Sequence, residues 1–187
     1  MSRKKRLFIL VEGEDDVRFF GRIIKPLFVS RYESVEIIPY ACTRREKVNN
    51  FLKSIRQMNN DYIFVADIDC ERSVRDKKQL LYFHFNTIAG NSIVIVIKEI
   101  ESWYYAGLSG TAAEHLGVEE LRSTDALFKE DFNRRIPEKY DSRIDFMFEI
   151  LKSFSLDVAA EKNRSFRFFV ERYGLAGRKP DLVVHTS

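Results

Sequence analysis

Carboxylate side chains gather at three places in this chain, and each place directly follows a run of apolar residues. The three segments read LFILV-EGEDD (7–16), YIFVA-DIDCE (62–71) and IVIVI-KEIES (93–102). Carboxylate oxygens are hard ligands of the kind Mg²⁺ prefers, and a Mg²⁺ site usually takes one or two of them and keeps several waters. Two such ions about 4 Å apart can activate a water and stabilise the leaving oxygen during phosphodiester cleavage. The pattern predicts an acidic site for one or two divalent ions.

Spacing within the clusters supports a shared site. The candidate ligands are six acids: Glu12, Asp16, Asp67, Asp69, Glu99 and Glu101. Gly13 has no side chain, so backbone and ligand can come close after Glu12. Positions two apart in an extended backbone point to one side, so we expect Asp67 and Asp69 to face one cation. Glu99 and Glu101 repeat that spacing.

Each acid also has a possible role without a metal. Asp15 or Asp16 can be the N-cap of a helix after the first apolar run. Asp69 can cap a turn, and Glu99 and Glu101 can pair with the lysine at position 98 or with an arginine. Because three clusters converge at one predicted edge, the pattern favours the metal site over these alternatives.

Parallel strands are the elements that can bring these clusters together. Continuous apolar runs are typical of strands buried on both faces of a parallel sheet. We expect four strands: Leu7–Val11, Val35–Tyr40 with Pro39 at an end or edge, Tyr62–Ala66 and Ile93–Ile97. Helical spacing marks residues 17–28, 45–58 and 73–84 between them. The carboxyl ends of such strands line one edge, where open α/β folds build their sites. We therefore expect an α/β domain over residues 1–106.

The second half of the chain, residues 107–187, has the pattern of a mostly helical extension. Phe166, Phe169, Val170 and Tyr173 recur at helical spacing and predict a buried face instead of a ligand site. No flexible linker separates the halves, so we expect the extension to pack on the sheet.

Composition and cysteine usage narrow the class of protein. The 187 residues are 45% hydrophobic and 32% charged, which is typical of a globular domain, and no apolar run reaches the roughly 18–20 residues of a membrane span. The apolar stretch after the basic N-terminus is too short for an export signal. Cys42 and Cys70 lack metal-ligand spacing, which argues against zinc and thiol chemistry. We expect a cytoplasmic protein.

Basic pairs lie away from the acidic clusters, at Arg44-Arg45, Lys77-Lys78, Arg134-Arg135 and Arg178-Lys179. A basic surface around an acidic centre suits a polyanionic ligand brought to bound cations. A solvated surface is the alternative for each pair. Arg44 and Arg45 are the predicted phosphate contacts.

At its acidic motifs the chain resembles a Toprim domain, the catalytic fold shared by topoisomerases, bacterial primases and several nucleases. The matching motifs are Glu12-Gly13 and Asp67-Ile68-Asp69. An acid four residues after the first Glu resembles the overcoming-lysogenization-defect (OLD) nuclease branch. The segment EIESWY (99–104) is similar to small stand-alone Toprim-like proteins of that branch. The resemblance covers residues 6–106.

The resemblance implies a Rossmann-like fold, a site and an activity. By it, Mg²⁺ or Mn²⁺ would bind to five acids, namely Glu12, Asp16, Asp67, Asp69 and Glu101. OLD relatives also use a lysine from the C-terminal part, for which Lys162 is the candidate, with a solvated lysine as the alternative. Glu12 can double as general acid or base beside the cations. The implied protein is an endonuclease acting on DNA or RNA, with a role in anti-phage defence.

Three further implications concern partners and rival functions. The chain has no Gly-x-x-x-x-Gly-Lys-Ser/Thr motif, so an ATPase must be a separate subunit or absent. A Toprim fold that binds nucleic acid or a partner without cutting is one alternative. A signalling receiver whose aspartate accepts phosphate is another, and the Asp67-x-Asp69 pair and the helical second half fit it less well.

Overall fold

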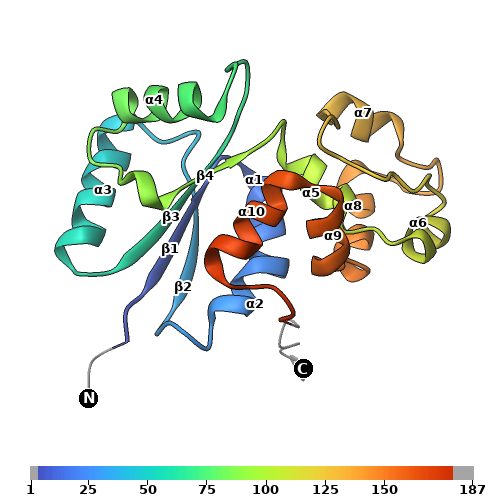
Figure 1. The fold of residues 1–187 in the computed structure, drawn as a ribbon, viewed down its shortest axis with the longest axis horizontal. Helices are drawn as coiled ribbons and strands as arrows, with labels where there is room; N and C mark the ends of the chain where they lie inside the picture. Colours follow the sequence, from blue (N-terminus) through green and yellow to red (C-terminus); the bar gives the residue numbers. More distant parts are fainter. Residues whose placement is uncertain (1–3, 179–187) are drawn as a thin grey trace. The chain divides into compact units, whose positions relative to one another are not determined.

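The computed structural model describes residues 4–178, and its central feature is a four-stranded sheet in the order β2-β1-β3-β4 (Figure 1). The strands are β1 (Leu7–Val11), β2 (Val35–Pro39), β3 (Asp61–Asp67) and β4 (Ile93–Val96). Strand β1 pairs in parallel with both β2 and β3, with Leu7 opposite Val35 and opposite Asp61. All five residues of β1 are buried, as expected of an apolar run at the centre of a sheet. The predicted mainly parallel α/β sheet is confirmed.

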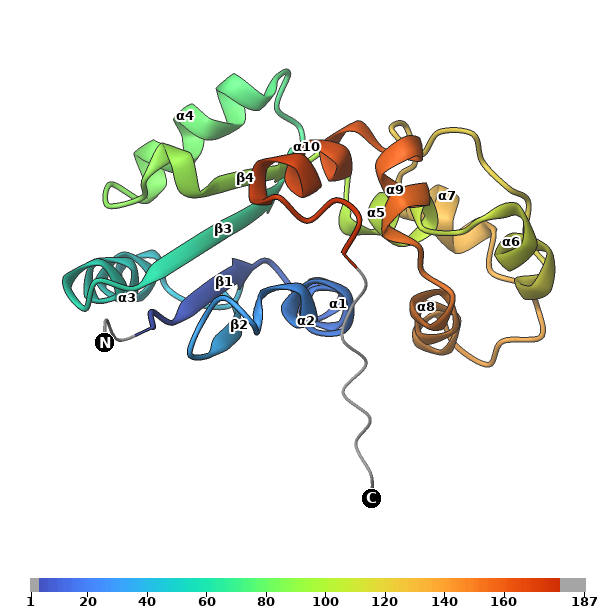
Figure 2. The same cartoon turned by 60° about the horizontal axis from the view of Figure 1, so that its bottom comes forward.

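Helices cover both faces of this sheet (Figures 1 and 2). On one face lie α1 (Glu14–Phe19), a π-helical turn η1 (Phe20–Ile24) and α2 (Lys25–Phe28), and on the other lie α3 (Arg45–Gln57) and α4 (Val74–His84). A short 3-10 turn η2 (Gly90–Ser92) precedes β4. Phe8 of β1 meets Phe51 of α3 edge to face at 5.5 Å between ring centroids, which ties α3 to the sheet. Placing helices on both faces explains why the strands are apolar throughout.

The helical segment after β1 differs from the prediction at its N-cap, and a π-helical turn interrupts it. Its N-cap is Gly13, so the expected N-cap at Asp15 or Asp16 is wrong. Asp16 lies one turn later and serves the same helix end by accepting from the Gly13 N–H at 3.1 Å, while Asp15 pairs with Arg18 at 2.6 Å. The π-turn ends two residues before Pro26, whose ring and missing N–H disturb the regular hydrogen-bond ladder.

The chain divides into two compact units. Within the described residues, those up to Ala66, Cys70–Ile95 and Arg178 form the first unit, and Asp67–Asp69 with Val96–Gly177 form the second. The division near residue 95 lies earlier than the boundary at 106 expected from the sequence, because α5 (Ile100–Ala106) belongs to the second unit. Residues 179–187 of the predicted extension lie outside the described chain.

The second unit is mostly helical, as predicted. After α5 it contains α6 (Gly110–Leu116), α7 (Lys129–Arg134), α8 (Arg143–Lys152), α9 (Leu156–Lys162) and α10 (Arg164–Tyr173). Its core is aromatic: the Trp103 ring lies 5.0 Å from Phe166 and 5.5 Å from Phe169 between centroids. The predicted buried face of α10 is confirmed for Phe166, Phe169 and Val170. Within residues 4–178, no helix combines the length and apolar character that a membrane span requires.

Candidate functional site

Glu12 is the first residue beyond β1, and the backbone around it is firmly placed. The Tyr40 N–H donates to the Val11 carbonyl at 2.9 Å, and the Ala41 N–H donates to the Glu12 carbonyl at 3.2 Å. The Tyr40 hydroxyl lies 2.9 Å from the Val65 carbonyl and 3.3 Å from Glu12 Oε1. One hydroxyl proton serves one acceptor at a time, and the shorter contact is to the carbonyl. Tyr40 therefore ties the end of β1 to the end of β3 and lies within reach of the Glu12 carboxylate.

Asp16 lies close to the same strand end. Its side chain folds back so that Oδ2 accepts from the Gly13 N–H, and only 5% of the residue is exposed. This is the predicted return of Asp16 toward Glu12. A Cβ added at Gly13 would meet only Asp16 Oδ2, at 3.9 Å, which is an ordinary contact. The fold of this turn therefore has room for a side chain at position 13.

Asp67 and Asp69 are placed by the ends of β3 and β4. Asp67 is the last residue of β3, and the N–H of Ile68 donates to the Val96 carbonyl at 2.9 Å. Asp69 has φ of 51°, a left-handed conformation that aspartate tolerates better than most residues. The backbone is therefore not extended through the Asp-x-Asp pair, and the expectation that its spacing alone aims both carboxylates to one side is wrong.

Glu99 and Glu101 each have a partner within the second unit. Glu99 is the N-cap of α5, and its Oε2 accepts from the backbone N–H of Lys129 at 2.8 Å. Glu101 lies inside α5, is 2% exposed and forms an ion pair with Arg143 of α8. Burial raises the pKa of Glu101, and the Arg143 guanidinium opposes that shift. The alternative of pairing with an arginine is confirmed for Glu101, and the strand-like spacing predicted for the two acids is wrong because a helix begins between them.

Lys162, the last residue of α9, is held by two groups of the second unit. Its Nζ donates to the Leu108 carbonyl at 2.6 Å and to Glu120 Oε1 at 2.8 Å, and 10% of its side chain is exposed. The alternative of a solvated lysine is therefore wrong. A role for this ammonium in catalysis or phosphate binding stays a prediction, and it requires the Glu120 pair to open or to be shared.

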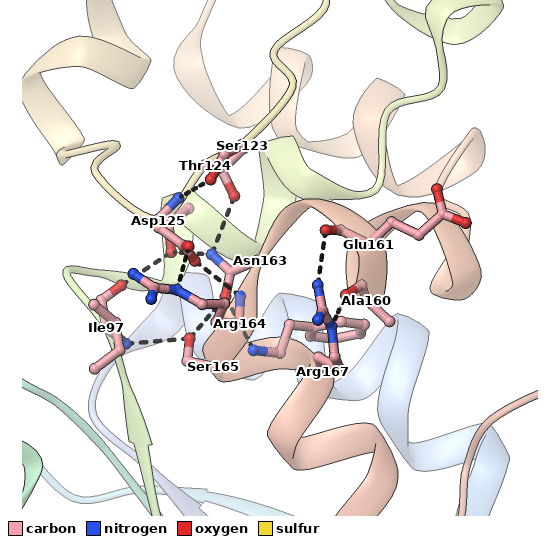
Figure 3. Close-up of polar contacts among 12 residues, drawn as sticks. Ile97, Ser123, Thr124, Asp125, Ala160, Glu161, Asn163, Arg164, Ser165 and Arg167 are labelled. Atoms are coloured by element: carbon pink, nitrogen blue, oxygen red, sulfur yellow. Dashed lines mark hydrogen bonds and ion pairs between the residues drawn. The ribbon is translucent and has the colours of Figure 1, made fainter.

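A buried amide, Asn163, organises the chain next to Lys162 (Figure 3). It is the C-cap of α9 and the N-cap of α10. Its Oδ1 accepts from the Phe166 N–H at 2.9 Å and from the Ser165 hydroxyl at 2.7 Å, and its Nδ2 donates to Thr124 Oγ1 at 3.0 Å. Ser165 Oγ in turn accepts from Trp103 Nε1 at 2.8 Å. The spacing of the sequence gives no sign of this network, because its members are up to 62 residues apart.

Arg44 and Arg45 begin α3 and are exposed. They come a few residues after β2, whose carboxyl end lies at the same edge of the sheet as the end of β1, because the two strands are parallel. Their phosphate contacts stay a prediction.

The predicted metal ligands divide between the two compact units. Glu12 and Asp16 belong to the first, while Asp67, Asp69 and the acids at 99 and 101 belong to the second. Over residues 4–178 the structure gathers no group of three or more His, Cys, Asp or Glu side chains in an arrangement that could hold a metal ion. The first four of these acids are Glu12, Asp16, Asp67 and Asp69. Their carboxylate oxygens are donors of the kind that suits Mg²⁺ or Mn²⁺.

Comparison with known proteins gives a likeness of fold. No family model matches the sequence, and no curated protein matches it. Among solved structures, the C-terminal region of the OLD protein of Xanthomonas campestris pv. campestris matches at 16% identity with a TM-score of 0.47. The match covers 90% of this chain and 93% of that one. At this identity and score the likeness carries no argument about activity.

Proposed function

We propose that this protein is a metal-dependent nuclease that hydrolyses phosphodiesters of DNA or RNA. The observation that carries the proposal is the pair of carboxylates at the end of the central strand. Glu12 lies one residue beyond β1, and the nearly buried Asp16 folds back onto Gly13 at 3.1 Å. The neighbouring parallel strand β3 ends in Asp67. Parallel strands that end in acids at one edge are the usual framework of a site in an open α/β fold.

In this proposal Glu12, Asp16, Asp67 and Asp69 hold one or two Mg²⁺ or Mn²⁺ ions. A bound ion would supply charge neutralisation at the scissile phosphate and a water of lowered pKa. Glu12 moves a proton between its carboxylate and the attacking or leaving oxygen, a role that a carboxylate beside bound cations can fill. Metal binding by Glu99 and Glu101 stays part of the proposal, and it requires Glu101 to share its Arg143 pair and Glu99 to share its contact with the Lys129 N–H.

The remaining parts of the proposal concern substrate and partners. Arg44 and Arg45 contact phosphates, and Lys162 joins them when Glu120 releases it. The proposal includes a separate ATPase subunit as a partner. A cytoplasmic location and a role in defence against phage complete the proposal.

Cleavage assays on three substrates test the proposal. The full chain is incubated with plasmid, single-stranded DNA and total RNA in Mg²⁺, in Mn²⁺ and in EDTA. Cleavage should need the metal and should be lost in Asp67→Asn and in Glu12→Gln, with thermal unfolding unchanged. The matched control is Asp157→Asn, which alters an exposed aspartate of α9. Undiminished cleavage by Asp67→Asn overturns the assignment.

The second candidate is a Toprim-like module that binds nucleic acid without cutting it. Two ion pairs favour it, since Glu101 is engaged by Arg143 and Lys162 by Glu120. It predicts binding that persists in EDTA and no cleavage in either metal. The same assay, followed by a binding measurement, separates the two candidates.

A further inference from the structure

Helix α4 exposes aromatic surface that the core of the protein does not use. Phe83 is 83% exposed, the largest value among the exposed large apolar side chains of the described chain, and its neighbour Tyr82 is 42% exposed. Burial of a phenylalanine side chain stabilises a folded protein, so leaving Phe83 in water forgoes that stabilisation. The Phe83 ring lies 5.7 Å from the His84 ring between centroids. The two rings are tilted by 54° to each other, so the exposed Phe83 ring is the accessible face, and we call this pair at the end of α4 the Phe83–His84 platform.

Positive charge lies next to this platform within the first unit. Asn49 of α3 donates to the His84 carbonyl at 3.3 Å, which places the first turns of α3 beside the end of α4. Arg45 is one turn before Asn49 on the same face of α3, and Lys77 is two turns before His84 on α4. Burial, and then the nearby charges of Arg45 and Lys77, lower the pKa of His84. That electrostatic effect agrees with the helix geometry, so His84, Arg45 and Lys77 lie close together in the first unit.

The start of α3 and the start of α4 both carry a net positive charge. Residues 44–47 and 72–78 contain seven Lys or Arg and two acids. Of the two acids, Asp76 is engaged by the Ser73 hydroxyl at 2.8 Å. Arg44 and Arg45 are exposed, so they can reach a ligand directly, whereas Lys77 is 5% exposed and contributes through its field. Such a surface is complementary to a polyanion.

We propose that the Phe83–His84 platform and the start of α3 bind single-stranded nucleic acid. An unpaired base offers a flat face to Phe83, and base–aromatic stacking contributes about 1–3 kcal/mol per base. The phosphates beside that base would meet Arg44 and Arg45. A duplex supplies phosphates but keeps its base faces stacked inside, so it leaves Phe83 without a partner. The inference rests on the proposed function for its substrate class and narrows that class to single strands.

Fluorescence anisotropy with labelled oligo-dT and oligo-U of about 20 nucleotides, and with a duplex of equal length, tests this surface. Measurements are made in EDTA, so that cleavage cannot contribute. Phe83→Ala should weaken single-strand binding by about 5- to 150-fold, the range that stacking on one base implies. Phe83→Trp should bind at least as well as the wild type, and duplex binding should not respond to either change.

Two further variants sharpen the test. Arg45→Ala should weaken the binding of both the single strand and the duplex, because it removes a phosphate contact. It should also reduce the dependence of affinity on salt concentration. Phe168→Ala is the matched control, since Phe168 is 51% exposed on α10 in the second unit. The inference is overturned if Phe83→Ala binds single strands like the wild type, as a protein-docking role for Phe83 predicts, or if the wild type binds no single strand.

This experiment is independent of catalysis. Binding that depends on Phe83 in a protein without nuclease activity supports the inference and removes the proposed function. Metal-dependent cleavage by a protein whose single-strand binding does not depend on Phe83 supports the proposed function and removes the inference.

Discussion

Arg143 of α8 forms an ion pair with Glu101 of α5 across 42 residues of sequence, and 3% of the Glu101 side chain is exposed. A buried carboxylate needs a partner, because desolvation penalises its charged form. Glu101 is therefore one of the groups that fix α8 on α5.

Removing the arginine should expose this dependence. Arg143→Ala leaves the Glu101 carboxylate buried without its cation and should lower the free energy of unfolding by about 3 kcal/mol. Adding Glu101→Gln to Arg143→Ala removes the charge and should recover part of the loss. Urea unfolding followed by circular dichroism measures both variants. Equal stability of Arg143→Ala and the wild type would show that the pair contributes nothing.

Asn163 should contribute more than an ordinary helix cap. Asn163→Ala removes the acceptor for the Phe166 N–H and leaves the Ser165 and Thr124 hydroxyls short of partners inside the core. A lost cap costs about 1 kcal/mol and a buried unsatisfied group about 1–3 kcal/mol, so we expect a total near 3 kcal/mol.

The control for Asn163 is another N-cap of the same unit. Ser155 caps α9 by accepting from the Val158 N–H at 3.4 Å and is half-buried. Ser155→Ala should cost about 1 kcal/mol. If the two variants unfold at the same urea concentration, the network around Asn163 adds nothing to its capping role.

Gly107 is predicted to tolerate a side chain poorly because of the Phe154 ring. A Cβ at this position would lie 2.2 Å from Phe154 Cδ2, although φ of −74° suits any residue. Gly107→Ala should therefore cost about 1–3 kcal/mol through overpacking. Combining it with Phe154→Leu should cost less than the sum of the single changes. Gly21→Ala, where nothing lies within 4 Å of the new atom, is the control and should not destabilise the protein.

Gly13 gives the opposite expectation, in which function changes and stability does not. With φ of −139° and no close neighbour, Gly13→Ala should unfold within about 0.5 kcal/mol of the wild type. If a phosphate approaches the backbone after Glu12, the new methyl group should reduce metal-dependent cleavage at least several-fold. Full activity in Gly13→Ala would mean that the ligand keeps away from this turn.

Local patterns in the sequence were enough to predict the sheet. The apolar run 7–11 is a strand because its five residues are all buried, and Pro39 ends β2 at an edge of the sheet, as its missing N–H requires. The carboxyl edge and the return of Asp16 toward Glu12 follow from the same local rules.

Contacts between distant residues limited what could be predicted of the site. The pairs Glu101–Arg143 and Lys162–Glu120 each join positions 42 apart, and no periodic pattern encodes them. The left-handed backbone at Asp69 depends on how the chain leaves β3 toward α4, so the assumption of an extended Asp-x-Asp pair failed there. Residues that serve long-range packing and residues that serve chemistry look alike in a single sequence.

His84 should make single-strand binding depend on pH. In the free protein burial is the main cause that lowers its pKa below the ordinary 6.5, followed by the charges of Arg45 on α3 and Lys77 on α4. A bound phosphate offsets those two charges and raises the His84 pKa, so the complex holds a proton that the free protein lacks. By linkage, affinity for oligo-dT should rise as pH falls from about 7.5 to about 5.5.

Substitution separates His84 from other titrating groups. His84→Gln should flatten the pH dependence and leave affinity near pH 7.5 almost unchanged, because the wild-type imidazole is neutral there. His115→Gln changes an exposed position of α6 and is the control. Its affinity for oligo-dT should depend on pH as that of the wild type does. Anisotropy at constant ionic strength measures all three proteins, since salt alone changes affinity for a polyanion. An equal rise on acidification in His84→Gln would assign the proton to another group and remove His84 from the binding surface.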